Sequence, residues 1–200
     1  MPTKKSIEGT IKDQYSRFFT SDDISAFKSI AEYYLRQATK LKKKDIEIEA
    51  EFLRLWVRNI QKRLYIGMGC ELLLKSYFLK CGYCINKPIS KGTTKPPYRI
   101  QDINPAEFKV DDTFTFNELL DQLPKIICFS DHSQIMKGLK IAKVFRNKEG
   151  HIAVYWHKFD PQNYKDIEAA LTSFYREAFS QTIKIRFSMQ AGEKNIFEIE

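Results

Sequence analysis

The stretch FRNKEGH at residues 145–151 holds three side chains whose chemistry suits a phosphate group: Arg146, Asn147 and His151. Arginine offers a planar fork of donors that matches a phosphate, and histidine takes or gives a proton near neutral pH. Asparagine adds a neutral donor and acceptor. An arginine and a histidine together suffice to cleave a phosphodiester without a metal, because the arginine neutralises developing charge while the histidine handles a proton.

The spacing of this motif sets a geometric condition. Five residues of a regular helix turn through about 500°, which leaves Arg146 and His151 about 140° apart around the axis. The two side chains converge only where the helix ends or bends between them, and Gly150 permits such a bend. If they converge, RNA is a suitable substrate, since its own 2′-hydroxyl supplies the nucleophile. The alternative is that Arg146 stabilises a helix C-terminus while His151 lies on the surface.

The composition is that of an ordinary globular protein. Of the 200 residues, 43% are hydrophobic and 29% are charged, so one domain with a sizeable core is expected. No run of about 18 apolar residues exists and the start carries no apolar signal segment, so we expect a cytoplasmic protein that does not enter a membrane. The net charge of +8 favours an anionic partner such as nucleic acid.

Apolar periodicity predicts that helices position the motif. A first helix is expected over residues 22–42, and a second, unusually long one over residues 46–80. Gly67 and Gly69 in the second helix are candidate points for a kink or for close packing. No internal repeat is visible.

Capping signals predict the remaining helices. Thr115 and Glu118 form a capping box at the start of a third helix, which should break near Pro124. Another apolar stripe follows over residues 132–145, directly before the motif. A last helix should begin at Asp160, the expected N-cap, with Pro161 in the first position.

Two segments do not follow the helical pattern. Residues 85–112 contain four prolines and no helical stripe, so we expect an extended loop, basic in its first half, inserted in the bundle. Residues 181–200 alternate apolar and polar around Gly192, which predicts a small β-hairpin. The expected fold is therefore mainly all-α: an antiparallel four- to five-helix bundle over residues 1–180 with a C-terminal hairpin appendage.

The basic loop is a candidate RNA-binding segment. Tyr98 could stack on a base while Arg99 grips a phosphate. The loop cations that could guide RNA are Lys87, Lys91, Lys95 and Arg99.

The motif in its context resembles the HEPN superfamily. Members carry an arginine and a histidine separated by four to six residues, often with asparagine directly after the arginine; here the motif runs from Arg146 through Asn147 to His151. It stands between the third and fourth main helices, before a long last helix. A second likeness is GCELLLKSYFLKCGY, similar to the E-x3-K helix of many HEPN proteins through Glu71 and Lys75. The resemblance covers roughly residues 22–180, without the 85–112 insertion.

The resemblance implies a HEPN-type bundle and a metal-independent endoribonuclease that needs no cofactor. HEPN proteins commonly form homodimers in which two motifs meet, and many are toxins or antiviral defence factors. Carried over, Arg146 and His151 are catalytic, Asn147 orients them or the phosphate, and Glu71 with Lys75 supports Arg146. RNA is then the partner, and any antitoxin or regulatory protein is a separate chain.

Other interpretations stay open. The chain could be a catalytically inactive HEPN-like module that binds a protein or a nucleotide, and Glu71 and Lys75 could form a plain surface ion pair. The C-x-x-C pair of Cys81 and Cys84 lacks the preceding strand that a redox motif needs. With Cys128 and His132 it could hold a structural zinc ion, although helix-end cysteines without a metal are the simpler interpretation.

Overall fold

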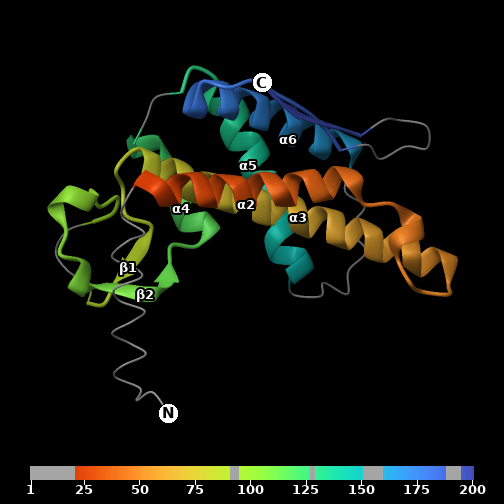
Figure 1. Cartoon of the computed structure of the whole chain (residues 1–200), viewed down its shortest axis with the longest axis horizontal. Helices are drawn as coiled ribbons and strands as arrows, with labels where there is room; N and C mark the ends of the chain where they lie inside the picture. Colours follow the sequence, from red (N-terminus) through yellow and green to blue (C-terminus); the bar gives the residue numbers. More distant parts are fainter. Residues whose placement is uncertain (1–20, 91–94, 127–128, 151–159, 188–194) are drawn as a thin grey trace, which may run out of the picture. The chain divides into compact units, whose positions relative to one another are not determined.

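The computed structural model describes residues 21–90, 95–126, 129–150, 160–187 and 195–200, and this part of the chain is mainly helical (Figure 1). Among the helices described there, none is long and apolar enough to cross a membrane. The elements in chain order are α2 (Ser21–Lys40), η1 (Lys43–Asp45), α3 (Glu51–Lys80), β1 (Asn86–Pro88), η2 (Ile100–Asp102), η3 (Pro105–Glu107), β2 (Phe108–Thr113), α4 (Phe116–Ile126), α5 (His132–Gly150), α6 (Pro161–Phe174), η4 (Tyr175–Phe179), β3 (Ile183–Arg186) and β4 (Ile196–Ile199).

The chain divides into two compact units. Unit 1 comprises Met1–Ser29 and Leu72–Ile127, and unit 2 comprises Ile30–Glu71 and Cys128–Glu200. Helices α2 and α3 contribute residues to both units. The prediction of a mainly helical chain with a small antiparallel hairpin near its C-terminus is confirmed.

In unit 2, helices α5 and α6 pack closely against each other. A Cβ at Gly138 would stand 2.3 Å from the Cβ of Ala170 and 2.6 Å from the carbonyl oxygen of Asp166, so this glycine permits the approach. Toward the other end of α5, the rings of Phe145 and Tyr164 lie 5.2 Å apart. Because later residues of α5 meet earlier residues of α6, the two helices are antiparallel.

The start of α6 matches its prediction. The Asp160 carboxylate accepts a hydrogen bond of 2.8 Å from the backbone N–H of Gln162, and Pro161 is the first helical residue. Such a cap satisfies a backbone donor that has no partner within the helix. After α6 the chain continues into η4, a π-helical turn.

The turn η4 reaches back to the beginning of α5. The Glu177 carboxylate accepts hydrogen bonds from the backbone N–H groups of Ser130 at 2.6 Å and Asp131 at 3.2 Å. It also accepts one from the Ser130 hydroxyl at 2.8 Å. A negative charge on free backbone donors at a helix N-terminus is stabilising, so Glu177 caps α5 from a distant part of the sequence.

The C-terminal hairpin also belongs to unit 2. Strand β3 pairs with β4 in antiparallel register, from Ile183 opposite Ile199 to Arg186 opposite Ile196. Ile183 and Ile185 are buried while Lys184 and Arg186 are exposed, which is the period of two expected for a strand with one covered face. The predicted turn residue Gly192 lies outside the described residues.

Helix α3 begins later than predicted. The sequence indicated a start at residue 46, whereas the helix begins at Glu51, after the short 3-10 turn η1. The Arg54 guanidinium donates hydrogen bonds to the carbonyls of Ile48 and, at 3.1 Å, of Glu49. Because a side chain satisfies these carbonyls, the segment before Glu51 needs no helical hydrogen bonds.

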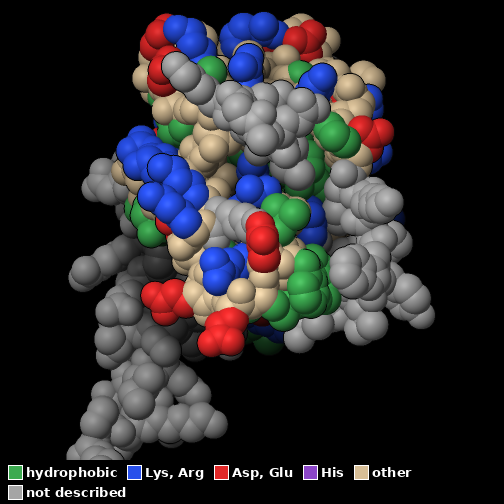
Figure 2. All heavy atoms as spheres, turned by 90° about the vertical axis from the view of Figure 1, so that its right-hand side faces the viewer, with side chains coloured by type: hydrophobic (Ala, Val, Ile, Leu, Met, Phe, Trp, Pro, Cys, Tyr) green, Lys and Arg blue, Asp and Glu red, His purple; other side chains and the backbone are tan. Residues whose placement is uncertain are grey.

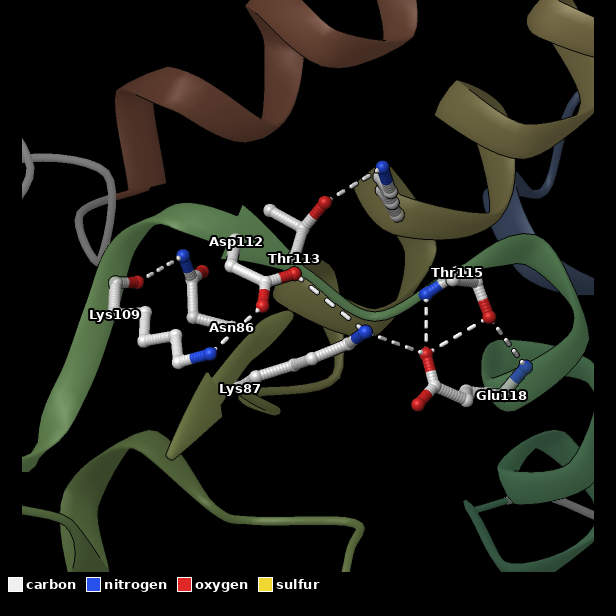
Figure 3. Close-up of polar contacts among 8 residues, drawn as sticks. Asn86, Lys87, Lys109, Asp112, Thr113, Thr115 and Glu118 are labelled. Carbon is white, nitrogen blue, oxygen red and sulfur yellow. Dashed lines mark hydrogen bonds and ion pairs between the residues drawn. The ribbon is translucent and has the colours of Figure 1, made fainter. Parts of the chain in front are cut away.

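In unit 1, the segment 85–112 was predicted to be an extended loop, and the structure contains a pair of short strands there. Strand β1 pairs antiparallel with β2, with Asn86 opposite Thr113 and Pro88 opposite Phe108. The Asn86 side chain adds a 2.9 Å hydrogen bond to the carbonyl of Lys109 (Figure 3). The prolines that suggested a loop lie outside the paired part or at the end of β1, where a missing N–H is tolerated.

Helix α4 confirms its predicted capping box, and it ends at Ile126, close to Pro124, where a break was predicted. The Thr115 backbone N–H donates to the Glu118 carboxylate at 2.7 Å, and the Glu118 N–H donates to the Thr115 hydroxyl at 3.3 Å (Figure 3). Pro124 lies inside the helix, which continues to Ile126. A proline so near the end removes one hydrogen bond without disturbing the preceding turns.

Candidate functional site

Arg146 and Asn147 lie in the last turns of α5, before its last residue Gly150. The helix continues to Gly150, so the backbone stays helical up to the residue before His151. Both side chains are exposed. His151, the third residue of the motif, lies outside the described residues, so its position relative to Arg146 stays a prediction.

The backbone of Arg146 is pressed against α3 at Gly67. A Cβ on Gly67 would stand 2.5 Å from the Cβ of Arg146 and 2.8 Å from both its Cα and its backbone nitrogen. No real Cβ tolerates such distances, so only glycine at position 67 lets the two helices approach this closely. Since α3 continues without interruption past Gly67 and Gly69, both glycines serve close packing and do not end the helix.

One turn after Gly67, α3 presents Glu71 to the arginine. The Nε of Arg146 donates to Oε2 of Glu71 at 2.7 Å, within a salt bridge. The Glu71 side chain is only 10% exposed, whereas that of Arg146 is 46% exposed. The structure thus brings together two residues that the sequence had linked, since Glu71 was expected to support Arg146.

The ion pair engages one edge of the guanidinium. In the part of the chain that the structure describes, Glu71 bonds to Nε, and the two terminal amino groups carry no hydrogen bond. A guanidinium has five N–H donors, so an Nε contact leaves the outer pair, which matches two phosphate oxygens. A fixed arginine with an exposed outer edge can bind an anion without first losing side-chain entropy.

Lys75, the second residue expected to support Arg146, has a contact elsewhere. Its Nζ donates to the Thr113 hydroxyl at 3.0 Å. This contact lies within unit 1 and ties the end of α3 to β2, whereas Glu71 and Arg146 belong to unit 2. The contact favours a structural role for Lys75.

The loop cations differ from one another in their surroundings. Lys87 forms ion pairs of 3.5 Å with Asp112 and 3.3 Å with Glu118 (Figure 3). Partial burial acts to lower the pKa of Lys87, but the two carboxylates outweigh it and raise the pKa above its ordinary value. A lysine neutralised by two acids is poorly placed to attract RNA, so Lys87 is a weaker candidate than the sequence suggested.

Tyr98 is also a weaker candidate than predicted. Its ring stacks on Phe114 with 6.3 Å between centroids and meets the edge of Phe108 at 5.3 Å. This packing covers part of the half-buried ring and leaves less of it for a base to stack on. Lys95 and Arg99 are exposed, and Lys91 lies outside the described residues.

The C-x-x-C pair closes the end of α3. The N–H of Gly82 bonds to the carbonyl of Leu79, and that of Tyr83 to the carbonyl of Phe78, both at 2.9 Å. With Gly82 at φ +76°, these bonds form a Schellman cap, which explains the glycine between the cysteines.

The thiols of this pair are not activated. Burial raises the pKa of Cys81, and it raises the pKa of Cys84 to about 11, so both are protonated at neutral pH. Over the described ranges, no three histidine, cysteine or acidic side chains gather into a metal site. Cys128 lies outside those ranges, so the four-ligand zinc hypothesis stays a prediction.

Two cations near the site were not singled out from the sequence. Lys140 and Lys143 precede Arg146 on α5 at steps of three residues, a signal that is visible in the sequence once the helix is known to continue past residue 145. By contrast, the lysines after α2 are followed by acidic residues at 45, 47, 49 and 51. Figure 2, which looks at the side where Figure 1 draws the α2–α3 connection, shows blue basic and red acidic side chains intermixed.

In the part of the site that the structure describes, Glu71 holds the guanidinium of Arg146 in place. Asn147 lies beside Arg146 in the last turns of α5. This arrangement can bind and polarise a phosphate, and it requires a proton-transfer group to cleave one. No family model, curated protein or solved structure matches the chain.

Proposed function

We propose that the chain is a metal-independent endoribonuclease of HEPN type, a toxin or defence factor in which Arg146, Asn147 and His151 act on the RNA backbone. The 2′-hydroxyl attacks the neighbouring phosphorus as the bond to the 5′-oxygen of the next nucleotide breaks. His151 takes the hydroxyl proton or returns one to the departing oxygen. The products are a 2′,3′-cyclic phosphate and a free 5′-hydroxyl.

The observation that carries the proposal is the contact between Arg146 and Glu71. Glu71 holds Nε of Arg146 at 2.7 Å, and nearly half of the arginine side chain is exposed. Charge develops on the phosphoryl oxygens in the transition state, and fixed donors stabilise such charge better than mobile ones. Asn147, exposed on the same turn of α5, can orient the phosphate or His151.

The proposal includes a homodimer. On a regular helix, the positions of Arg146 and His151 differ by about 140° around the axis, so one chain does not present both on one face. A second copy related by a twofold axis would bring its own motif to the same cleft, and Arg146 of one chain would then act with His151 of its partner.

The test is RNA cleavage by the purified chain in the presence of EDTA. We expect cleavage without metal, and products that end in a 2′,3′-cyclic phosphate. His151→Ala should abolish cleavage, and so should Arg146→Ala. His132→Ala, which removes a histidine at the start of α5, should cleave like the parent protein.

Folding must be checked for each variant, because Arg146→Ala leaves the largely buried Glu71 carboxylate without this partner. His151→Ala carries no such cost, so the two variants together separate chemistry from stability. Cleavage at the parental rate by both folded variants would refute the proposal. Tight RNA binding without any cleavage by the parent chain would instead favour an inactive binding module.

A further inference from the structure

Helix α3 begins with large apolar side chains that stay accessible. Phe52 is 66% exposed and Leu55 is 43% exposed. Every residue from 51 to 61 is exposed or half-buried, whereas Ile66 further along the helix is fully buried. The half-buried side chains beside the exposed pair include further apolar ones: Leu53, Val57 and Ile60. A helix of a globular chain normally turns such side chains toward a core, so their exposure as a group indicates a contact surface.

The connection that leads into this helix carries two opposite runs of charge. From residue 40 to residue 51 the sequence holds four lysines and then four acidic residues, so the formal charge of this segment is zero. Figure 2 looks at the end of α3 where this connection lies and shows green hydrophobic side chains beside the blue and red ones. We call the α3 tip the surface formed by exposed residues of both kinds: Lys40, Lys44, Glu47, Glu49, Phe52 and Leu55.

The α3 tip is complementary to itself. In a contact with twofold symmetry, a residue of one chain meets a different residue of the other chain, and the same pair recurs on the opposite side of the axis. The basic run of each copy can therefore lie against the acidic run of the other, around the apolar side chains. Two copies also repel each other least at a surface of zero charge, since the net charge of +8 lies on the other residues. RNA is not attracted to a surface without excess positive charge.

We propose that the α3 tip binds the α3 tip of a second copy of this chain. All of its residues belong to unit 2. Leu55 precedes Gly67, on which Arg146 packs, by twelve residues, which is about 18 Å of helix. The contact is therefore separate from the shared cleft of the proposed nuclease. A chain that uses both twofold contacts closes into a tetramer when the two axes are perpendicular.

The first test compares molar masses by size-exclusion chromatography with light scattering. The test variant is Phe52→Glu with Leu55→Glu. The control is Ile30→Glu with Tyr33→Glu, which changes two exposed apolar residues on α2 away from the tip. We expect the test variant to have half the mass of the parent and the control to keep the parental mass. An unchanged mass in the test variant would overturn the inference, and so would the same loss of mass in the control.

A second test asks whether the partner is another copy of the chain. One variant carries Lys40→Glu with Lys44→Glu, and the other carries Glu47→Lys with Glu49→Lys. Each variant alone loses the attraction between the two runs on both sides of the axis, so we expect association at least about tenfold weaker. In a mixed pair, the unchanged acidic run of the first variant meets the unchanged basic run of the second, and mixing should restore part of the association.

A mixture that stays dissociated would overturn the inference, because the tip would then contact a different protein or another part of its own chain. All the substituted side chains are exposed, so the fold should be kept, and circular dichroism with urea unfolding checks this for every variant.

The outcomes are independent of the proposed nuclease. If the mass of the test variant is halved but the parent never cuts RNA, the tip contact stands and the nuclease proposal fails. If the parent cuts RNA and the test variant keeps the parental mass, the nuclease proposal stands and the tip contact is wrong. Where both are right, the test variant is a dimer that cuts RNA at the parental rate per chain.

Discussion

The guanidinium of Arg146 contacts Glu71 along one edge, and nearly half of the arginine side chain is exposed. Arginine–carboxylate pairs are frequently bidentate, whereas the hydrogen bond from Arg146 to Glu71 is made by Nε. The sequence predicted this partnership only through the likeness to HEPN proteins. It could not predict the partners of Lys87, because Asp112 and Glu118 approach that lysine through β2 and α4, which are distant in sequence.

Replacing Glu71 by glutamine tests whether the pair positions Arg146. Glu71→Gln keeps the shape and a weaker acceptor but removes the charge that holds Nε. We expect the rate of RNA cleavage to fall about tenfold to a hundredfold, as for a displaced catalytic group, with RNA binding little changed. Kinetics with unfolding measurements on the same samples separate the two effects.

The matched control is Glu200→Gln, which makes the same change in the ion pair between Glu200 and Lys184. This exposed pair should contribute little, so the control should be as active and stable as the parent. Full activity in Glu71→Gln would mean that Arg146 does not depend on its carboxylate partner.

At the level of elements, local signals predicted well and distant pairings did not. The caps of α4 and α6 are contained in a few consecutive residues, and both were correct. The pairing of β1 with β2 joins strands separated by a long stretch of chain, and no periodicity in the sequence predicts this pairing. The delayed start of α3 depends on Arg54, a side chain that folds back onto preceding carbonyls.

The crossing of α3 and α5 leads to a prediction about Gly67. Gly67→Ala would place a methyl group 2.5 Å from the Arg146 Cβ, so the helices must move apart. We expect a loss of about 1–3 kcal/mol of folding free energy, partly offset by about 1 kcal/mol from the better helix propensity of alanine. Urea unfolding and RNA cleavage on the same samples measure both effects.

Gly69→Ala is the control for this substitution. Its new methyl group would meet side-chain atoms of Leu35 at 2.8 Å and 2.9 Å, on a different helix from Arg146. Stability should fall in this variant too, but activity per folded molecule should fall only in Gly67→Ala. Equal activity of the two folded variants would show that the close approach is not needed for catalysis.

The capping box of α4 predicts a pH effect on stability. Partial burial acts to raise the pKa of Glu118, but the hydrogen bonds from Thr115 and the charge of Lys87 outweigh it and lower the pKa below its ordinary 4.5. A lowered pKa means that the stabilisation is complete above pH 4.5 and is lost as the pH falls through the folded-state value. Glu118→Ala should therefore cost roughly 1 kcal/mol at neutral pH and much less in acid.

Urea unfolding of the parent and Glu118→Ala at neutral and acidic pH measures this difference. Asn117→Ala, a neighbouring change on α4 outside the capping box, serves as the control and should show no comparable pH dependence. A difference between parent and Glu118→Ala that stays constant with pH would contradict the assignment.

At the scale of the whole molecule, the sequence predicted that positive charge guides RNA through the basic loop before α4. The structure adds two further cations, Lys140 and Lys143, on α5. Lys87 is neutralised by carboxylates and the Tyr98 ring is packed against Phe114, whereas Lys140 and Lys143 precede the motif on α5. Composition gives the amount of positive charge, but only the helix boundaries and the ion pairs show where that charge lies on the molecule.

The homodimer makes a quantitative prediction. If Arg146 of one chain works with His151 of its partner, a mixed dimer of Arg146→Ala and His151→Ala has one intact site. Mixing equal amounts of these two inactive variants under exchange conditions should then restore about one quarter of the parental activity. Activity that stays at zero in a mixture shown to exchange subunits would exclude a site shared in this way.

The bond between Glu177 and the beginning of α5 has a practical consequence for shortened versions of this chain. A fragment that stops after α6 would keep every residue of the motif yet lose the carboxylate that holds Ser130 and Asp131. Its motif helix would fray from the opposite end, and a loss of function could be mistaken for a role of the missing tail in substrate contact. Truncations should therefore end beyond Phe179, so that the last π-helical turn is retained.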